Sequence, residues 1–351
     1  MQSVAHGRRG AAFVLIAALL LLAPAAAARA AGRQIPSPGP LPVVPADFPD
    51  RVITGPRAAS VAGPLASAHR HLYATPDGGR VEVAVSRSYP PDAAADQALV
   101  NFLAGRLHGS ELGRLRLFVG KPAEVSALCG GGGAIACYAP DEERMYVPGE
   151  ESAGVPMEYA ITHEYGHHLA SWRSNRPWSA LDWGPKYWAS EQRVCAGVRH
   201  RVLFPGDQGS HYFDDPGEGF ADSYAHLYYP AAAWRYNPLM RPDTGAFGAI
   251  RRDVLHPWHG PRTRTLRGRR ARTMRIRLHL DGDVRVRVRA RRGSRFRVVT
   301  RTSDWAAGRR LRPGRSFGIE WCRRRATDVM TVSVERRAGA GRFALKVSYP
   351  G

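Results

Sequence analysis

Two histidines and a glutamate in this sequence have a spacing that suits metal chemistry. The run His163-Glu164-Tyr165-Gly166-His167 lies inside a stretch, 156–172, that we predict to be helical. Residues four apart lie on one face of a helix, so both imidazoles can bind one metal ion. Glu164 projects beside them and can take the proton of a water held by that metal. We therefore predict that His163 and His167 bind zinc and that Glu164 is the general base.

A catalytic zinc site also needs a third protein ligand and an open fourth position. A second predicted helix, opened by Asp215 and Pro216, carries Glu218 and, one turn later, Asp222. Glu218 is the candidate third ligand, and Asp222 is a candidate acceptor for the hydrogen bond that orients a ligating imidazole. Two simpler interpretations stay open: Glu218 could form a capping box with Asp215, and Asp222 could be a solvated helix residue.

An HExxH helix followed by a Glu-x-x-x-Asp helix resembles the gluzincin metallopeptidases. The resemblance implies that His163, His167 and Glu218 are zinc ligands, Glu164 the base and Asp222 an orienting partner. The segment between the two helices is longer than in compact gluzincins. It carries Trp178, Trp183 and Trp188, which could be core residues or substrate contacts.

Peptide hydrolysis needs a hydrogen-bond donor for the tetrahedral oxyanion. In several gluzincins a Tyr or His shortly before the third ligand supplies it, which implies Tyr212 or His211 here. Tyr224 and His226, on the helix of Glu218, are rival candidates. The strand predicted over 144–148 precedes the metal helix, and we expect it to be an edge strand that pairs with an extended substrate.

The N-terminus has the layout of a secretory signal. Arg8 and Arg9 precede an apolar run, and a small-residue end predicts cleavage after Ala30. An uncleaved anchor is the alternative. No later run is apolar enough to span a membrane, so we expect a secreted, extracellular protein.

Export permits disulfide bonds among the four cysteines. Cys129 and Cys137 enclose a glycine-rich loop, and a local bridge is their simplest pairing. Cys195 and Cys322 could tie two domains together or remain free thiols.

The positive charge is concentrated in the C-terminal segment. Residues 261–351 hold 26 Arg and one Lys against six acids, and this accounts for the whole net charge of +21. These arginines could hold the protein to an anionic cell-wall polymer or to nucleic acid by charge alone. They could also be the solvated face of a sheet, since Arg285, Arg287 and Arg289 alternate with valines. We expect no specific nucleic-acid binding, because residues 1–260 carry no net charge.

Hydrophobic periodicity predicts strands over 80–86, 115–119 and 144–148, and helices over 93–107, 155–172 and 187–199. Alternation over 272–299, 329–334 and 343–347 predicts an antiparallel sandwich. The expected fold class is α+β, a zincin-like catalytic domain followed by an all-β sandwich. The expected division is a signal peptide 1–30, a Pro/Ala-rich linker or pro-segment 31–70, a catalytic domain 71–260 and a basic β-sandwich 265–351.

These expectations combine into a secreted zinc-dependent metallopeptidase that acts on a protein or peptide substrate. Glu164 would activate the water that attacks the scissile carbonyl. Two alternatives stay open. One is a catalytically silent protein that binds anionic polymer at a surface, and the other is a zinc hydrolase that cleaves a non-peptide bond.

Overall fold

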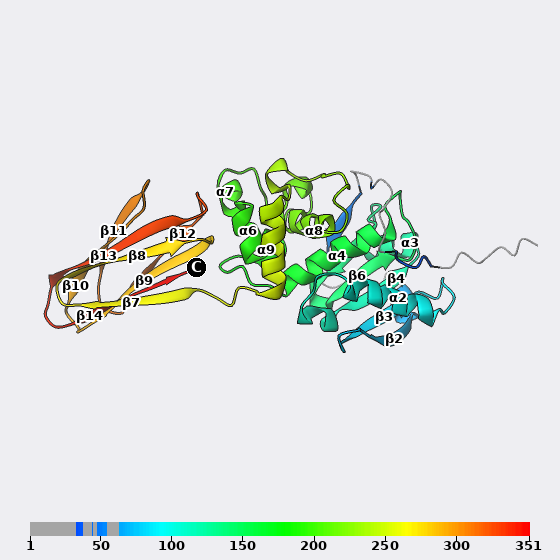
Figure 1. Ribbon diagram of the computed structural model, residues 1–351, viewed down its shortest axis with the longest axis horizontal. Helices are drawn as coiled ribbons and strands as arrows, with labels where there is room; N and C mark the ends of the chain where they lie inside the picture. Colours follow the sequence, from blue (N-terminus) through cyan, green and yellow to red (C-terminus); the bar gives the residue numbers. More distant parts are fainter. Residues whose placement is uncertain (1–32, 38–43, 45–47, 55–62) are drawn as a thin grey trace, which may run out of the picture. The chain divides into compact units, whose positions relative to one another are not determined.

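The computed structural model describes residues 33–37, 44, 48–54 and 63–351 (Figure 1). The predicted signal peptide and its cleavage site at Ala30 lie outside these residues. Within them, none of the helices has the length and apolar character that crossing a membrane requires.

The first part of the α+β fold is a mixed six-stranded sheet in the order β1-β5-β6-β4-β3-β2. Its strands are β1 (Asp50–Val52), β2 (His69–Ala74), β3 (Arg80–Val85), β4 (Arg116–Gly120), β5 (Ala136–Ala139) and β6 (Arg144–Pro148). β3, β4 and β6 run parallel to one another, β5 pairs antiparallel with β6, and β1 pairs parallel with β5. β1 therefore forms the edge of the sheet beyond β5.

The predicted strands over 80–86, 115–119 and 144–148 correspond to β3, β4 and β6. The expectation that 144–148 is an edge strand is wrong, because β5 lies between β6 and the edge. A 3-10 turn, η3 (Pro140–Glu142), and the left-handed Glu143 (φ 52°) join β5 to β6 as a tight hairpin. β5 was not predicted, because two of its four residues are alanine, a weak strand former, whereas β6 contains Tyr146 and Val147.

The helices associated with this sheet are α1 (Gly63–Ala66), α2 (Ala93–Ala104), η2 (Ser110–Arg114), α3 (Pro122–Leu128) and α4 (Met157–Ser171). They pack on two hydrophobic clusters, α2, η2 and α4 on the larger and α1 and α3 on the smaller. Asp92 caps α2 by accepting a hydrogen bond from the backbone N–H of Ala95 at 2.9 Å. α4 contains the metal-type motif and is buried along almost its whole length.

A second group of helices follows α4 in the chain. It comprises α5 (Ala180–Trp183), α6 (Lys186–Glu191), α7 (Val194–Arg199), η4 (Tyr212–Asp214), α8 (Pro216–His226), η5 (Pro238–Met240) and α9 (Thr244–Leu255). The single helix predicted over 187–199 is wrong: it is divided into α6 and α7 at Arg193, whose backbone is left-handed with φ 54°. Trp188 is a fully buried core residue, whereas Trp178 and Trp183 stack on each other with ring centroids 4.4 Å apart.

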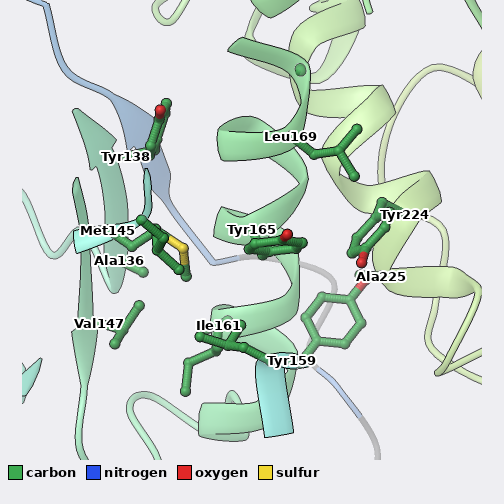
Figure 2. Close-up of a cluster of buried hydrophobic side chains, with 14 of the residues drawn as sticks. Ala136, Tyr138, Met145, Val147, Tyr159, Ile161, Tyr165, Leu169, Tyr224 and Ala225 are labelled. Carbon is green, nitrogen blue, oxygen red and sulfur yellow. The ribbon is translucent and has the colours of Figure 1, made fainter. Parts of the chain in front are cut away.

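α4 lies between the sheet and α8. Figure 2 shows Ile161, Tyr165 and Leu169 of α4 between strand residues such as Met145 and Val147 and the α8 residue Tyr224. The two helices approach closely at Gly166, where an added Cβ would lie 2.7 Å from the Cα of Ala221. A glycine inside the motif therefore sets the spacing between the two helices.

The C-terminal part of the fold consists of two antiparallel four-stranded sheets (Figure 1). Their orders are β11-β10-β13-β8 and β12-β9-β14-β7. The strands are β7 (Arg262–Gly268), β8 (Ala271–Leu278), β9 (Gly282–Ala290), β10 (Arg295–Arg301), β11 (Ala306–Leu311), β12 (Ser316–Trp321), β13 (Asp328–Ala338) and β14 (Phe343–Tyr349). Inward side chains of both sheets, such as Val286 and Val332, share one core, while the arginines that alternate with them along β9 are exposed.

Two disulfide bonds join the four cysteines. Cys129–Cys137 closes the local glycine-rich loop, as predicted. Cys195 at α7 is bonded to Cys322 just after β12, which settles the pairing that the sequence left open. Disulfides are compatible with an exported protein.

Candidate metal centre

α4 carries three of the predicted site residues on its buried surface. His163, Glu164 and His167 are each 0% exposed. The ring centroids of the two histidines are 5.0 Å apart, as expected for positions one helical turn apart. α4 therefore presents two imidazoles and one carboxylate in the interior of the protein.

α8 brings Glu218 to the same place. Asp215 caps this helix by accepting a hydrogen bond from Gly217 N–H at 2.9 Å, with Pro216 in its first turn. Glu218 does not turn back to complete a capping box. Its Oε2 lies 3.4 Å from Nε2 of His163 and 3.3 Å from Nε2 of His167, and its Oε1 accepts a hydrogen bond from Gln208 at 2.7 Å.

A fourth residue, Asp50 of β1, completes the group, and it was not among the candidates predicted from the sequence. Its Oδ2 lies 2.5 Å from Nε2 of His163, and the residue is 1% exposed. One ligand atom each from Asp50, His163, His167 and Glu218 lies within 4.8 Å of the other three. This buried Asp/His/His/Glu group could hold a metal ion.

The chemistry of the group fits a metal better than a self-contained hydrogen-bond network. Both carboxylate oxygens of Glu164 and the Nε2 of His167, the ring nitrogen that faces Glu218, are buried without a hydrogen-bond partner among the described residues. Buried polar atoms without partners are uncommon in proteins. Two imidazoles and carboxylates form a mixed nitrogen and oxygen donor set of the kind that binds zinc and related divalent ions.

The crowding of carboxylates controls protonation in the group. Burial alone would lower the pKa of His163, but the charge of Asp50 and the hydrogen-bonding partners Asp222 and Glu218 raise it well above its ordinary value. Burial raises the pKa of Glu164 well above its ordinary range, and the charge of Asp50 adds to that effect. Glu218 behaves in the opposite way: the two histidines outweigh its burial and hold its pKa well below normal. The group thus attracts positive charge.

Asp222 lies behind His163. Its Oδ1 is 3.4 Å from Nδ1 of that histidine and accepts a hydrogen bond from the hydroxyl of Tyr159 at 2.7 Å. Nε of Arg235 lies 3.8 Å from the same oxygen. Burial would raise the pKa of Asp222, but His163 and Arg235 hold it below its usual value. Asp222 is therefore a buried acid with the contacts needed to orient an imidazole.

The four candidates for the oxyanion donor occupy different environments. Tyr212 bonds through its hydroxyl to Tyr236 at 3.0 Å. His211 binds Asp207 at 2.7 Å and stacks on Phe204.

The two rival candidates lie on α8. The hydroxyl of Tyr224 donates to the carbonyl of Leu107 at 2.6 Å, and Nδ1 of His226 contacts the carbonyl of Asp222 at 2.9 Å. None of the four candidates forms a hydrogen bond, ion pair or ring contact with the two motif histidines or with Glu218.

Sequence reasoning missed two neighbours of the group, Arg235 and Tyr236. The hydroxyl of Tyr236 donates to Oε2 of Glu218 at 3.5 Å, and its ring stacks on His163. Arg235 donates to that hydroxyl at 2.6 Å and lies 3.6 Å from Oδ2 of Asp50. Both residues follow α8 in a loop that has no periodic pattern, so no local signal could have identified them.

A second cluster of potential ligands consists of Cys195, Glu320 and Cys322. Both cysteines are consumed by the disulfide bond, so their sulfurs are not available as thiolate ligands.

Fold and site together define an α+β protein with a buried group that could hold a metal ion and a basic antiparallel C-terminal part. No protein-family model matches the chain, and no curated protein matches it. Among solved structures, a mitogen derived from Yersinia pseudotuberculosis is similar over 25% of this chain and 86% of its own, with 8% sequence identity and a TM-score of 0.21. Similarity at that level carries no information about function.

Proposed function

We propose that the protein is a secreted zinc-dependent peptidase of the gluzincin type, with a zincin-like catalytic domain. One observation carries the proposal: two separate helices bring His163, His167 and Glu218 together around a buried position. Glu164 is close enough to this group for the charges of Asp50 and His163 to affect its pKa, yet its carboxylate has no hydrogen-bond partner among the described residues.

Each residue has a role in this proposal. His163, His167 and Glu218 would hold the zinc, and zinc in such a site polarises a substrate carbonyl and makes water more acidic. Glu164 would accept a proton from the attacking water and deliver it to the leaving amine. Asp222 would fix the ring of His163 through Nδ1, as outer carboxylates do at histidine metal sites.

The test compares Glu164→Gln with the wild type in the mature chain, since the amide keeps the shape of the side chain but cannot accept the proton. Because Asp50 lies within the ligand group, the substitution is made in both the wild-type and the Asp50→Asn background. Zinc content and cleavage of a denatured protein are measured together. We expect unchanged zinc and a loss of cleavage of at least about a hundredfold.

The matched control is Glu151→Gln, which alters an exposed glutamate shortly before α4 and should change neither quantity. Absence of both zinc and cleavage in every background would contradict the proposal. Bound zinc without cleavage of any protein, combined with hydrolysis of an ester or amide reagent, would favour the non-peptide hydrolase.

The arginines of the C-terminal sheets favour a second function that could accompany the first, adhesion to an anionic polymer. A surface groove over β10, β11 and β13 is lined by exposed arginines, among them Arg297, Arg309 and Arg310. Neutralising several phosphates or sulfates by arginine gives binding that weakens steeply with salt.

Replacing these three arginines by Gln should lower the salt at which the protein elutes from heparin. The same replacement of Arg285, Arg287 and Arg289 on β9 should lower it less. Equal shifts for the two triple variants would indicate that only net charge matters.

A further inference from the structure

The ligand group contains one carboxylate more than a catalytic zinc site requires. His163, His167 and Glu218 already supply three ligands, and such sites keep the fourth position for water or substrate. Asp50 lies in that same group, with Oδ2 2.5 Å from Nε2 of His163. A metal held by all four side chains would have the closed coordination typical of structural sites.

The backbone on either side of Asp50 is hydrogen-bonded to the sheet, and these bonds hold Asp50 in place. The N–H of Ile135 donates to the carbonyl of Pro49 at 2.8 Å, and the N–H of Ile53 donates to the carbonyl of Tyr138 at 2.8 Å. The ring of Phe48 lies between Tyr159, 5.9 Å away, and the guanidinium of Arg235, 3.6 Å away. The position of Asp50 is therefore fixed by backbone pairing and by a buried aromatic anchor.

The same segment is coupled to the third ligand through Gln208. The side-chain oxygen of Gln208 accepts a hydrogen bond from the N–H of Val52 at 3.1 Å. Its amide nitrogen donates to Glu218 at 2.7 Å and to Asp215 at 3.0 Å. One glutamine therefore joins β1, a metal-type ligand and the cap of α8.

β1 also occupies the edge of β5 that does not pair with β6. It pairs with β5 over three residues, Asp50 with Ala136 through Val52 with Tyr138. Extended peptides commonly bind by adding a strand to an exposed sheet edge. A peptide that paired with β5 would have to displace β1, and that displacement would also withdraw Asp50 from the ligand group.

We propose that Asp50 is the fourth protein ligand of the metal and that residues 48–53 hold the protein in a closed state. In this state β1 occupies both the open coordination position and the edge of β5. The inference rests on the proposed metal site but not on peptidase activity. If the proposed function holds, residues 48–53 must leave the site before a substrate can be cleaved.

The experiment uses the full chain loaded with cobalt(II), whose visible spectrum reports coordination, and azide as a small external ligand. Wild type is compared with Asp50→Asn and with Asp50→Ala, the second variant serving if the first fails to fold. Arg51→Ala is the matched control, because it alters the neighbouring residue of β1 and leaves the carboxylate in place.

We expect azide to change the cobalt spectrum of the Asp50 variants at concentrations at least about tenfold below any that affect wild type or Arg51→Ala. Cobalt affinity, measured by competition with a chelator, should also fall at least about tenfold in the Asp50 variants. Mutation of a residue that only supports a metal ligand already lowers affinity by about that factor, so loss of a ligand should lower it at least as much.

Equal azide binding by wild type and the Asp50 variants, or unchanged cobalt affinity, would overturn the inference. Failure of wild type to bind cobalt would overturn it together with the metal site. If the Asp50 variants open the site to azide, the closed state stands whether or not they cleave protein, because β1 still pairs with β5 in these variants. The peptidase proposal fails if the opened variants also leave a dipeptide amide uncleaved, since a substrate that short does not need the edge of β5.

Discussion

Tyr236 is the residue that the structure adds to the candidate chemistry. Its hydroxyl donates a hydrogen bond to Glu218, whereas the hydroxyl of Tyr212, one of the candidates from the sequence, bonds to the hydroxyl of Tyr236. A donor beside the metal can stabilise an oxyanion, and a donor one residue further away can only position the first.

We therefore expect Tyr236→Phe to lower kcat for protein cleavage by about 10² to 10³ with zinc content unchanged. Tyr212→Phe should lower it by less than about tenfold, because the donor itself remains. Both are assayed in the Asp50→Asn background, with zinc measured in each preparation. A larger loss for Tyr212→Phe would return the role to Tyr212, one of the candidates from the sequence.

At the residue scale, a contact within the site could be predicted from the sequence only when the residues that make it are close together in the chain or follow a known motif. His163 and His167 could be paired from spacing alone, since a helix fixes the geometry of residues four apart. Glu218 needed the recurring pattern of a second helix. Asp50 comes from a Pro- and Ala-rich stretch without periodicity, and only the pairing of β1 with β5 brings it to the histidines.

The contact between α4 and α8 controls the site at the level of elements. A Cβ at Gly166 would meet backbone atoms of Ala221, the Cα at 2.7 Å and the carbonyl oxygen at 3.1 Å. Backbone atoms cannot rotate away as a side chain can, so the two helices would have to separate. Separation would move Glu218 away from both histidines.

Gly166→Ala should therefore lower the free energy of unfolding by about 1 to 3 kcal/mol and weaken metal binding. The control is Gly248→Ala in α9, where an added Cβ meets nothing within 4 Å. That change should raise stability by up to about 1 kcal/mol, because alanine favours a helix over glycine. Urea unfolding and chelator competition give the two quantities, and unchanged metal affinity in Gly166→Ala would show that the helix spacing does not control the site.

Elements were predictable where the hydrophobic period was visible. β3 and β9 show the alternation from which they were predicted, and β4 and β6 are short, largely apolar runs. The predicted edge at 144–148 and the unbroken helix over 187–199 failed for another reason. Strand order and the left-handed conformation of Arg193 are set by tertiary contacts that a local pattern does not contain.

At the scale of the whole molecule, the disulfide Cys195–Cys322 closes a loop across a sequence separation of 127, against 8 for Cys129–Cys137. In the chain-entropy model a crosslink stabilises the folded state more when it closes a longer loop. The long-range bridge should therefore contribute more to stability than the local one.

The model gives about 5 kcal/mol for the long loop and about 2.5 kcal/mol for the short one. Replacing Cys195 and Cys322 by alanine should thus reduce the free energy of unfolding by about twice as much as replacing Cys129 and Cys137. Urea unfolding of both double variants under the same conditions tests the ratio. An equal or reversed ratio would mean that local packing, rather than loop closure, determines the effect.

The arginines on the strands at the sheet borders also affect how copies of the protein behave toward one another. Three of the four border strands of the two C-terminal sheets, β7, β8 and β11, each carry at least two arginines, and the fourth, β12, carries none. Unpaired strand borders invite pairing between molecules, which leads to aggregation, and rows of like charge oppose it. At 1 M salt the screening length falls to about 3 Å, so this protection weakens. The same charge that would bind a polymer would therefore also oppose pairing between copies along β7, β8 and β11 at low ionic strength.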